Sequence, residues 1–167
     1  NDVTSQVATQ FIKAVDMKEK VSADPITGTT VGNSLKGQVE IDKATQFYLS
    51  YDFLVPIGHS IQKGDFITSD VPEEITLLTD GSNLPTQFSK LVTEAGETIA
   101  EASLEQGNKI KYVFTDKVET TSNVGGTFLI EAAFNQSKIK TDGSTTVINF
   151  NISNTTLELT FKADAVA

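Results

Sequence analysis

The single histidine of the sequence, His59, is the first candidate for acid–base or nucleophilic chemistry. It lies in Pro56-Ile57-Gly58-His59-Ser60, where proline and glycine predict a loop. A Ser-His-Asp triad needs a nucleophile and an orienting carboxylate beside the imidazole. The sequence has no Gly-x-Ser-x-Gly elbow that would place such a serine. We therefore expect His59 to be a solvent-exposed loop histidine, and the chain to have no catalytic residues and not to be an enzyme.

The sequence contains 22 Asp and Glu residues. With so many, two carboxylates lie close together by chance, so a close pair is weak evidence for a catalytic acid and base. Asp80-Gly-Ser-Asn and Asp142-Gly-Ser resemble the start of a calcium loop, but neither continues with the required spacing and twelfth-position Glu. Asx-Gly pairs are more typical of hairpin turns. Because the chain has no cysteine and one histidine, thiolate and multi-histidine metal sites are excluded. We predict no metal and no cofactor.

Charge and composition narrow the classes of partner. All 13 basic residues are lysine, and the net charge is −9. Arginine is the residue that most often binds phosphate groups through paired hydrogen bonds, so its absence makes a phosphate-binding enzyme less expected. A negatively charged chain is not attracted to nucleic acid or anionic lipid. No apolar run is long enough to span a bilayer. The first residues lack the basic and apolar regions of a signal peptide, so we expect that any such peptide has been removed.

Short runs of alternating apolar and polar residues predict strands along most of the chain. The clearest run is 45–55, where every second residue is apolar. Threonine, a strand former, accounts for 22 residues. Short strands at close spacing predict an all-β, antiparallel sandwich or barrel made by a single domain, 1–167. The other predicted strands, separated by Gly-, Pro- and Asx-containing turns, are 66–71, 75–79, 109–114, 127–134, 146–152 and 156–161.

Four stretches are less regular. Residues 1–6 are polar, and we expect them to be frayed. Residues 7–21 fit both helical and strand periodicity, and we favour a strand because the stretch has no capping signal. Residues 22–37 predict a long irregular loop, an insertion or an edge hairpin. Residues 85–106 fit a short helical turn or hairpin strands equally well.

The apolar faces of the predicted strands define the expected core. Strand 127–134 is apolar at most positions, so we expect it to be central and buried on both faces, or nearly so. The residues expected in the core are Phe47, Leu49, Tyr51, Phe53, Phe66, Ile110, Tyr112, Phe114, Phe128, Ile130, Phe134, Ile148, Phe150, Leu157 and Leu159.

The order of several segments resembles a known family. These segments are Tyr51-Asp52-Phe53-Leu54-Val55-Pro56, Lys63-Gly64-Asp65-Phe66, Val71-Pro72-Glu73-Glu74-Ile75, Phe114-Thr115-Asp116-Lys117-Val118-Glu119 and Ser122-Asn123-Val124-Gly125-Gly126. Together with the strand that follows them, they resemble the N-terminal immunoglobulin-like subdomain of Gram-positive, cell-wall-anchored, matrix-binding adhesins, such as the collagen and fibrinogen adhesins. The resemblance covers 45–134.

The resemblance implies an immunoglobulin-like sandwich with extra strands, extracellular and anchored to the bacterial cell wall. It implies binding of a host or neighbouring-cell protein or glycoprotein, collagen-like or fibrinogen-like, together with a downstream sandwich domain of the same chain. The ligand-contacting residues are not identified by the sequence.

Two other functions are weighed against adhesion. A stalk or pilin-like spacer would position another domain and bind nothing itself. The polar start at Asn1 favours instead a domain at the outer tip of a surface protein, where a ligand-binding domain is expected. A carbohydrate-binding or hydrolytic sandwich would need exposed aromatic platforms. The chain has no tryptophan and three tyrosines, of which Tyr51 and Tyr112 are expected in the core, so only Tyr48 remains for that role.

The resemblance also implies a covalent candidate, because many Gram-positive adhesin domains join a lysine to an asparagine or aspartate by an isopeptide bond. The candidate lysine is Lys13, in the first predicted strand, and the candidate acid is Asp52, in the middle of the domain. The candidate amide is Asn149 or Asn151, near the last strands. The reaction needs a neutral, buried lysine and a protonated acid. Asp52 and both asparagines alternate with expected core residues, so the strand pattern predicts that they face outward.

Overall fold

Three sheets make up the part of the chain that the computed structural model describes, which is residues 1–22, 25–26, 31–78, 90–105, 109–150 and 154–163. The first sheet has the order β2 (Val31–Ser34), β1 (Ile12–Lys20), β3 (Gln46–Val55), β9 (Val124–Phe134), β5 (Ile75–Leu77). The second has the order β4 (Phe66–Asp70), β8 (Lys109–Phe114), β7 (Thr98–Glu105), β6 (Lys90–Val92). The third pairs β10 (Thr145–Phe150) with β11 (Thr155–Thr160).

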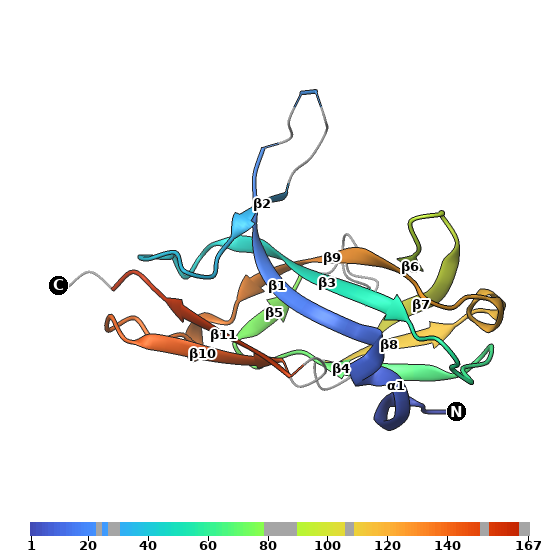
Figure 1. The fold of residues 1–167 in the computed structure, drawn as a ribbon. Coiled ribbons are helices and arrows are strands. Elements are labelled where there is room, and N and C mark those ends of the chain that lie inside the picture. Colours follow the sequence, from blue (N-terminus) through green and yellow to red (C-terminus); the bar gives the residue numbers. More distant parts are fainter. Residues whose placement is uncertain (23–24, 27–30, 79–89, 106–108, 151–153, 164–167) are drawn as a thin grey trace.

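The sheets are stacked in two layers. In Figure 1, β1, β3 and β9 of the five-stranded sheet run across the middle of the picture, with the β10–β11 hairpin below them at the left and β4 and β8 of the four-stranded sheet below them at the right. Aromatic rings join the layers: the centroids of Tyr112 and Phe128 are 5.7 Å apart, and those of Phe134 and Phe161 are 4.7 Å apart. The strands within each sheet pair antiparallel, from β1 with β2 to β10 with β11. The predicted all-β antiparallel sandwich is confirmed.

The predicted core is buried at every position except Phe66. Phe66 is half-buried, and the inward positions of β4 are Ile67 and Ser69. The prediction was wrong because the segment carries apolar side chains on both faces, so alternation does not say which face is inside. On the outer face, the ring of Phe66 lies 4.2 Å from the Lys111 Nζ, where an aromatic ring and an ammonium group attract each other.

Strand β9 lies between β3 and β5 and is therefore central in its sheet, as predicted. It begins at Val124, earlier than expected, and only one of its faces is fully buried. The residues between its core positions are half-buried, and Thr127 is exposed. The expectation of burial on both faces was therefore wrong, because the second layer covers only one side of the sheet.

The N-terminal predictions were partly wrong: the strand favoured for 7–21 is confirmed over β1, but its first residues and residues 1–6 differ. Residues 1–6 are not frayed, and a helix, α1 (Thr4–Phe11), precedes β1 where a single strand was expected. Phe11 is fully buried, with its ring stacked on Phe53 at 5.6 Å and edge-on to Phe114 at 5.3 Å. The helix therefore closes one end of the sandwich by inserting an aromatic ring between the layers.

Local hydrogen bonds hold the start of this helix. The Asp2 Oδ1 accepts the Thr4 backbone N–H at 2.9 Å and the Thr4 hydroxyl at 2.6 Å, and these bonds lower the pKa of the Asp2 carboxyl. The Val3 N–H donates to the Phe66 carbonyl at 2.9 Å, and the Thr68 N–H donates to the Thr4 hydroxyl at 2.9 Å. The N-terminal residues thus cover the outer edge of β4.

Two of the open alternatives are settled in favour of hairpins. Residues 31–34 form β2, which pairs antiparallel with β1 (Lys18 opposite Ser34, and Lys20 opposite Val31), so the stretch 22–37 contains an edge hairpin. Strands β6 and β7 also pair antiparallel, while residues 85–89 lie outside the described part of the chain. Two short 3₁₀ helices were not foreseen: η1 (Asp116–Thr120), which buries Val118, and η2 (Gln136–Lys138).

Two glycines at the start of β9 allow close backbone approaches. A Cβ on Gly125 would lie far inside van der Waals contact with the Phe53 carbonyl oxygen of β3. A Cβ on Gly126 would lie 2.9 Å from the Val92 carbonyl oxygen of β6. This corner, where the edge of the second sheet meets the first, therefore depends on the absence of side chains. No helix in the described residues is long and apolar enough to cross a membrane.

Candidate functional site

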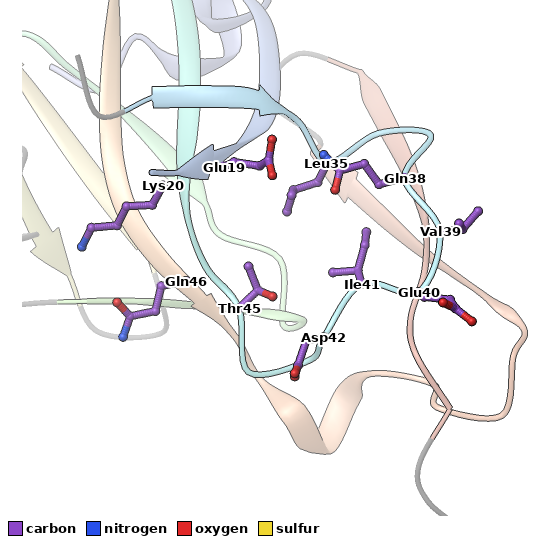
Figure 2. Close-up of a pocket in the computed structure, with 10 residues that line it drawn as sticks. All are labelled: Glu19, Lys20, Leu35, Gln38, Val39, Glu40, Ile41, Asp42, Thr45 and Gln46. Atoms are coloured by element: carbon purple, nitrogen blue, oxygen red, sulfur yellow. The ribbon is translucent and has the colours of Figure 1, made fainter. Parts of the chain in front are cut away.

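A surface groove of about 220 Å³ lies where β1 ends and β3 begins, beside the loop that joins β2 to β3. Figure 2 shows Leu35 and Ile41 pointing toward one another in its middle, while Val39 and Glu40 point away. The residues that line the groove are Glu19, Lys20, Leu35, Gln38, Val39, Glu40, Ile41, Asp42, Thr45 and Gln46.

Backbone hydrogen bonds tie the groove to both layers of the sandwich. The Leu35 N–H donates to the Met17 carbonyl of β1 at 2.8 Å. Ile41 forms a parallel bridge with the end of β11, where its N–H donates to the Thr160 carbonyl at 3.2 Å and its carbonyl accepts the Lys162 N–H at 2.8 Å. Because the loop is held from two sides, the groove is formed before any ligand arrives.

Tight local turns shape the loop and expose one apolar side chain. Glu40 adopts a left-handed backbone conformation with φ of 57°, and the Asp42 Oδ1 accepts the Ala44 N–H at 2.8 Å. Leu35 and Ile41 are buried, while Val39 is 78% exposed. Val39 is therefore the apolar side chain of this loop that would be shielded from water if a partner covered it.

The rim of the groove is acidic. Glu19 and Asp42 contribute carboxylates, the Glu40 carboxylate points away from the groove (Figure 2), and Lys20 is the single cation among the lining residues. The Lys20 Nζ lies 3.3 Å from the Glu131 carboxylate, so its charge is already balanced. The described lining holds no histidine. This arrangement suits binding of an extended polypeptide with apolar and cationic side chains.

A second hollow of about 260 Å³ is lined by His59, Ser60, Ile61, Gln62 and Glu119. The His59 Nδ1 accepts the Ile61 N–H at 3.0 Å, so the Nε2 carries the proton and donates to the Thr121 carbonyl at 2.7 Å. His59 is half-buried, so the expectation of a solvent-exposed side chain was wrong. Because both ring nitrogens bond to the backbone, His59 holds the β3–β4 loop against the end of η1.

The structure places the three crosslink candidates on two different sheets. Lys13 and Asp52 are exposed on the neighbouring strands β1 and β3, and Asn149 is exposed on β10. The Asp52 Oδ1 accepts the Thr127 hydroxyl at 2.7 Å, and the Asn149 Oδ1 accepts the Thr156 hydroxyl at 2.9 Å. The outward orientation of Asp52 and Asn149 agrees with the strand pattern, and Asn151 lies outside the described residues.

The crosslink stays a prediction that intact-protein mass spectrometry tests. A Lys13–Asn149 bond would lower the mass by one ammonia. Because both side chains are exposed and lie on different sheets, they are not positioned to react with each other, so we expect the mass of the unmodified sequence. A mass lower by one ammonia, absent in a Lys13→Ala variant, would contradict this expectation.

The calcium-like stretch at Asp142 forms a local turn. The Asp142 Oδ1 accepts both the backbone N–H and the hydroxyl of Ser144, which holds the pKa of this carboxyl below its usual value. The turn lies between η2 and β10, and β10 pairs with β11, so the predicted hairpin turn at Asp142-Gly143 was wrong. Asp80 lies outside the described residues, and the described part contains no group of three or more His, Asp or Glu that could hold a metal ion.

None of the three tyrosines offers an exposed stacking platform. Tyr48, expected on the outer face of β3, is only 3% exposed, and its ring lies 6.0 Å from the Lys20 Nζ. Burial raises the pKa of both Tyr51 and Tyr112, so both hydroxyls stay neutral in the core at physiological pH. This geometry does not support a carbohydrate-stacking site.

The fold defines the class of protein, which is a two-layered antiparallel β-sandwich with a surface groove at one end. The chain belongs to the bacterial Ig domain family, whose sequence profile matches residues 40–146. The predicted immunoglobulin-like class and the resemblance to adhesins of Gram-positive bacteria are thereby confirmed.

Among curated proteins, clumping factor A is similar in sequence to this chain. The chain is 30% identical over 156 residues to clumping factor A of Staphylococcus aureus (strain NCTC 8325 / PS 47), a match that covers 86% of this chain and 16% of that protein. The chain therefore spans a small part of the length of this curated relative.

Two solved structures have a similar fold. The serine-rich repeat adhesion glycoprotein Srr1 of Streptococcus agalactiae superposes with a TM-score of 0.59 at 19% identity, over 98% of this chain and 48% of that one. The collagen binding domain of the Erysipelothrix rhusiopathiae surface protein RspB gives 0.55 at 15% identity, over 98% and 48%. These two likenesses show the same fold as the bacterial immunoglobulin-like domain of this chain.

Proposed function

We propose that the chain is the ligand-binding module of an adhesin displayed on the cell wall of a Gram-positive bacterium. Its ligand is a matrix protein or another glycoprotein of the host or of a neighbouring cell, held together with a downstream sandwich domain. Membership of the bacterial Ig domain family and similarity to clumping factor A and to a collagen binding domain support this proposal. The module carries out no chemical reaction.

The groove beside the β2–β3 loop is the observation that carries the proposal. Its polar and acidic lining, together with the exposed Val39 beside it, suits an extended polypeptide segment. Ile41, in its wall, bonds to Thr160 and Lys162 at the end of the last strand. A domain that follows this strand would begin beside the groove and could close over a bound segment. Similar surface proteins are much longer than this chain, which supports such a neighbour.

Replacing Val39 by serine tests the groove. We expect the Val39→Ser variant, together with the downstream region, to bind its ligand about tenfold more weakly, because an exposed apolar contact is lost on one side of the interface. Surface plasmon resonance on immobilised collagen, fibrinogen, fibronectin and salivary glycoprotein provides the measurement.

The matched control is Val147→Ser, an exposed valine on the outer face of β10. We expect this control to leave binding unchanged. Equal losses in the two variants would contradict the assignment of the groove. If the wild-type protein binds none of the four ligands, the alternative function of a non-binding stalk or pilin-like spacer is supported instead.

A further inference from the structure

Three residues with hydroxyl groups lie in the core between the two layers. Tyr51 belongs to β3 of the five-stranded sheet, while Ser69 and Tyr112 belong to β4 and β8 of the four-stranded sheet. Tyr51 and Ser69 are each 1% exposed, and Tyr112 is fully buried. Because Tyr112 pairs with Ile67, two residues before Ser69 on β4, both hydroxyl-bearing side chains lie on the inward face of their sheet.

Two of these hydroxyls have no hydrogen-bond partner within the part of the chain that the structure describes. They are the Tyr51 Oη and the Ser69 Oγ. Burying a hydroxyl without a hydrogen bond is unfavourable, and buried polar groups in folded proteins nearly always have a partner. Packing alone does not explain a serine here, because its inward-facing neighbours Ile67 and Ile110 are apolar. Both hydroxyls therefore call for a partner other than a side chain or the backbone.

The hydroxyls are close enough to influence one another. Burial raises the pKa of Tyr51, and the neighbouring Ser69 hydroxyl opposes this rise. Burial also raises the pKa of Tyr112, and Tyr51 beside it raises that pKa further. Such effects act over short distances. Tyr51 and Ser69 are thus neighbours that do not bond to each other directly, and this is the arrangement in which a water molecule bridges two polar groups.

We propose that this place in the core is a binding site for one water molecule, held between the Tyr51 and Ser69 hydroxyls with the Tyr112 hydroxyl as a third polar contact. A buried water typically makes about three hydrogen bonds. The ring of Phe128 positions both phenols, since its centroid lies 4.8 Å from that of Tyr51 and 5.7 Å from that of Tyr112. Because Tyr51 belongs to one layer and the other two residues to the opposite layer, the water joins the layers by hydrogen bonds.

A high-resolution crystal structure of the unchanged sequence tests the site directly. We expect one ordered water within hydrogen-bonding distance of both the Tyr51 Oη and the Ser69 Oγ. A direct hydrogen bond between these two hydroxyls without a water, or no ordered water between them, would overturn the proposal.

Removing the hydroxyls one at a time tests their bond to a shared water. The variants Tyr51→Phe and Ser69→Ala keep nearly the same shape. Each removes one hydrogen bond to the water, so we expect each to raise the unfolding equilibrium constant about fivefold in urea denaturation. We expect the double variant to raise it by less than the product of the two single effects, because both hydroxyls bind the same water.

The matched control is Ser50→Ala, a buried serine next to Tyr51 on β3 whose side chain lies on the opposite face of the strand. We expect its effect and that of Tyr51→Phe to multiply without coupling. Coupling as strong as that with Ser69→Ala would show a general repacking of β3 and would contradict the water site. A Tyr51→Phe variant as stable as the wild type, or more stable, would show that the hydroxyl has no bond to lose, and the proposal would fail.

Discussion

Replacing Gly125 by alanine is expected to lower the free energy of unfolding by about 3 kcal/mol, at the upper end of the usual cost of overpacking. The added Cβ would collide with the Phe53 carbonyl oxygen, a backbone atom within the paired strand β3. A backbone atom cannot move aside as a flexible side chain can, so β9 must separate from β3. Urea denaturation followed by tyrosine fluorescence measures the change, since the chain has no tryptophan.

Gly143→Ala is the control for this substitution. Gly143 has φ of 87°, and no atom lies near the position of an added Cβ. Alanine there is therefore expected to lower the free energy of unfolding by about 1 kcal/mol, because of the left-handed backbone conformation alone. We expect the Gly125 variant to be clearly less stable than the Gly143 variant. Equal stabilities would show that β3 and β9 do not approach each other as closely as described.

Truncating Phe11 to alanine is the second change with a large expected effect, about 4 kcal/mol of unfolding free energy. The ring is fully buried between the layers and contacts Phe53 and Phe114. Its removal leaves a cavity at the end of the sandwich that α1 closes. The same denaturation measurement applies, and amide hydrogen exchange should show the loss first in α1 and β4.

Gln10→Ala is the matched control on the same helix, because Gln10 is exposed. We expect it to change stability by less than about 0.5 kcal/mol. If the Phe11 variant were as stable as the Gln10 variant, the original expectation of a loosely attached N-terminus would be the better description.

The strands of the two layers could be predicted because their side chains alternate between core and solvent. In β10, the pattern of Ile148, Asn149 and Phe150 gives both the strand and the face that is buried. The same rule failed at β4, where Phe66 and Ile67 are both apolar and only the packing against β8 decides which one faces inward.

The helix α1 was missed for a different reason. Its signal is the spacing of Val3, Val7 and Phe11, four residues apart, which places all three on one helical face. Eight residues are too few for a helix to be stable by its own propensity. It forms because Phe11 finds Phe53 and Phe114, and these contacts depend on the folded sandwich.

The groove could not be predicted, because its wall depends on residues far apart in the sequence. Ile41 meets Thr160 and Lys162 only after both layers have formed. The local signal was weak: Val39 and Ile41 alternate with Glu40 and Asp42 just before a strand, as they would in any strand approach. The exposure of Val39 distinguishes this stretch, and exposure is a property of the fold.

The parallel bridge at Ile41 has a mechanical consequence. Tension applied along the chain beyond Lys162 would load the two backbone hydrogen bonds of Ile41 at the same time, in shear. The force would then pass through the hydrogen bond between Leu35 and Met17 into strand β1. The load path therefore crosses the wall of the groove in which the proposed ligand would lie. If the protein is tethered and pulled as the proposed function implies, tension along the chain and retention of a bound segment would be physically coupled.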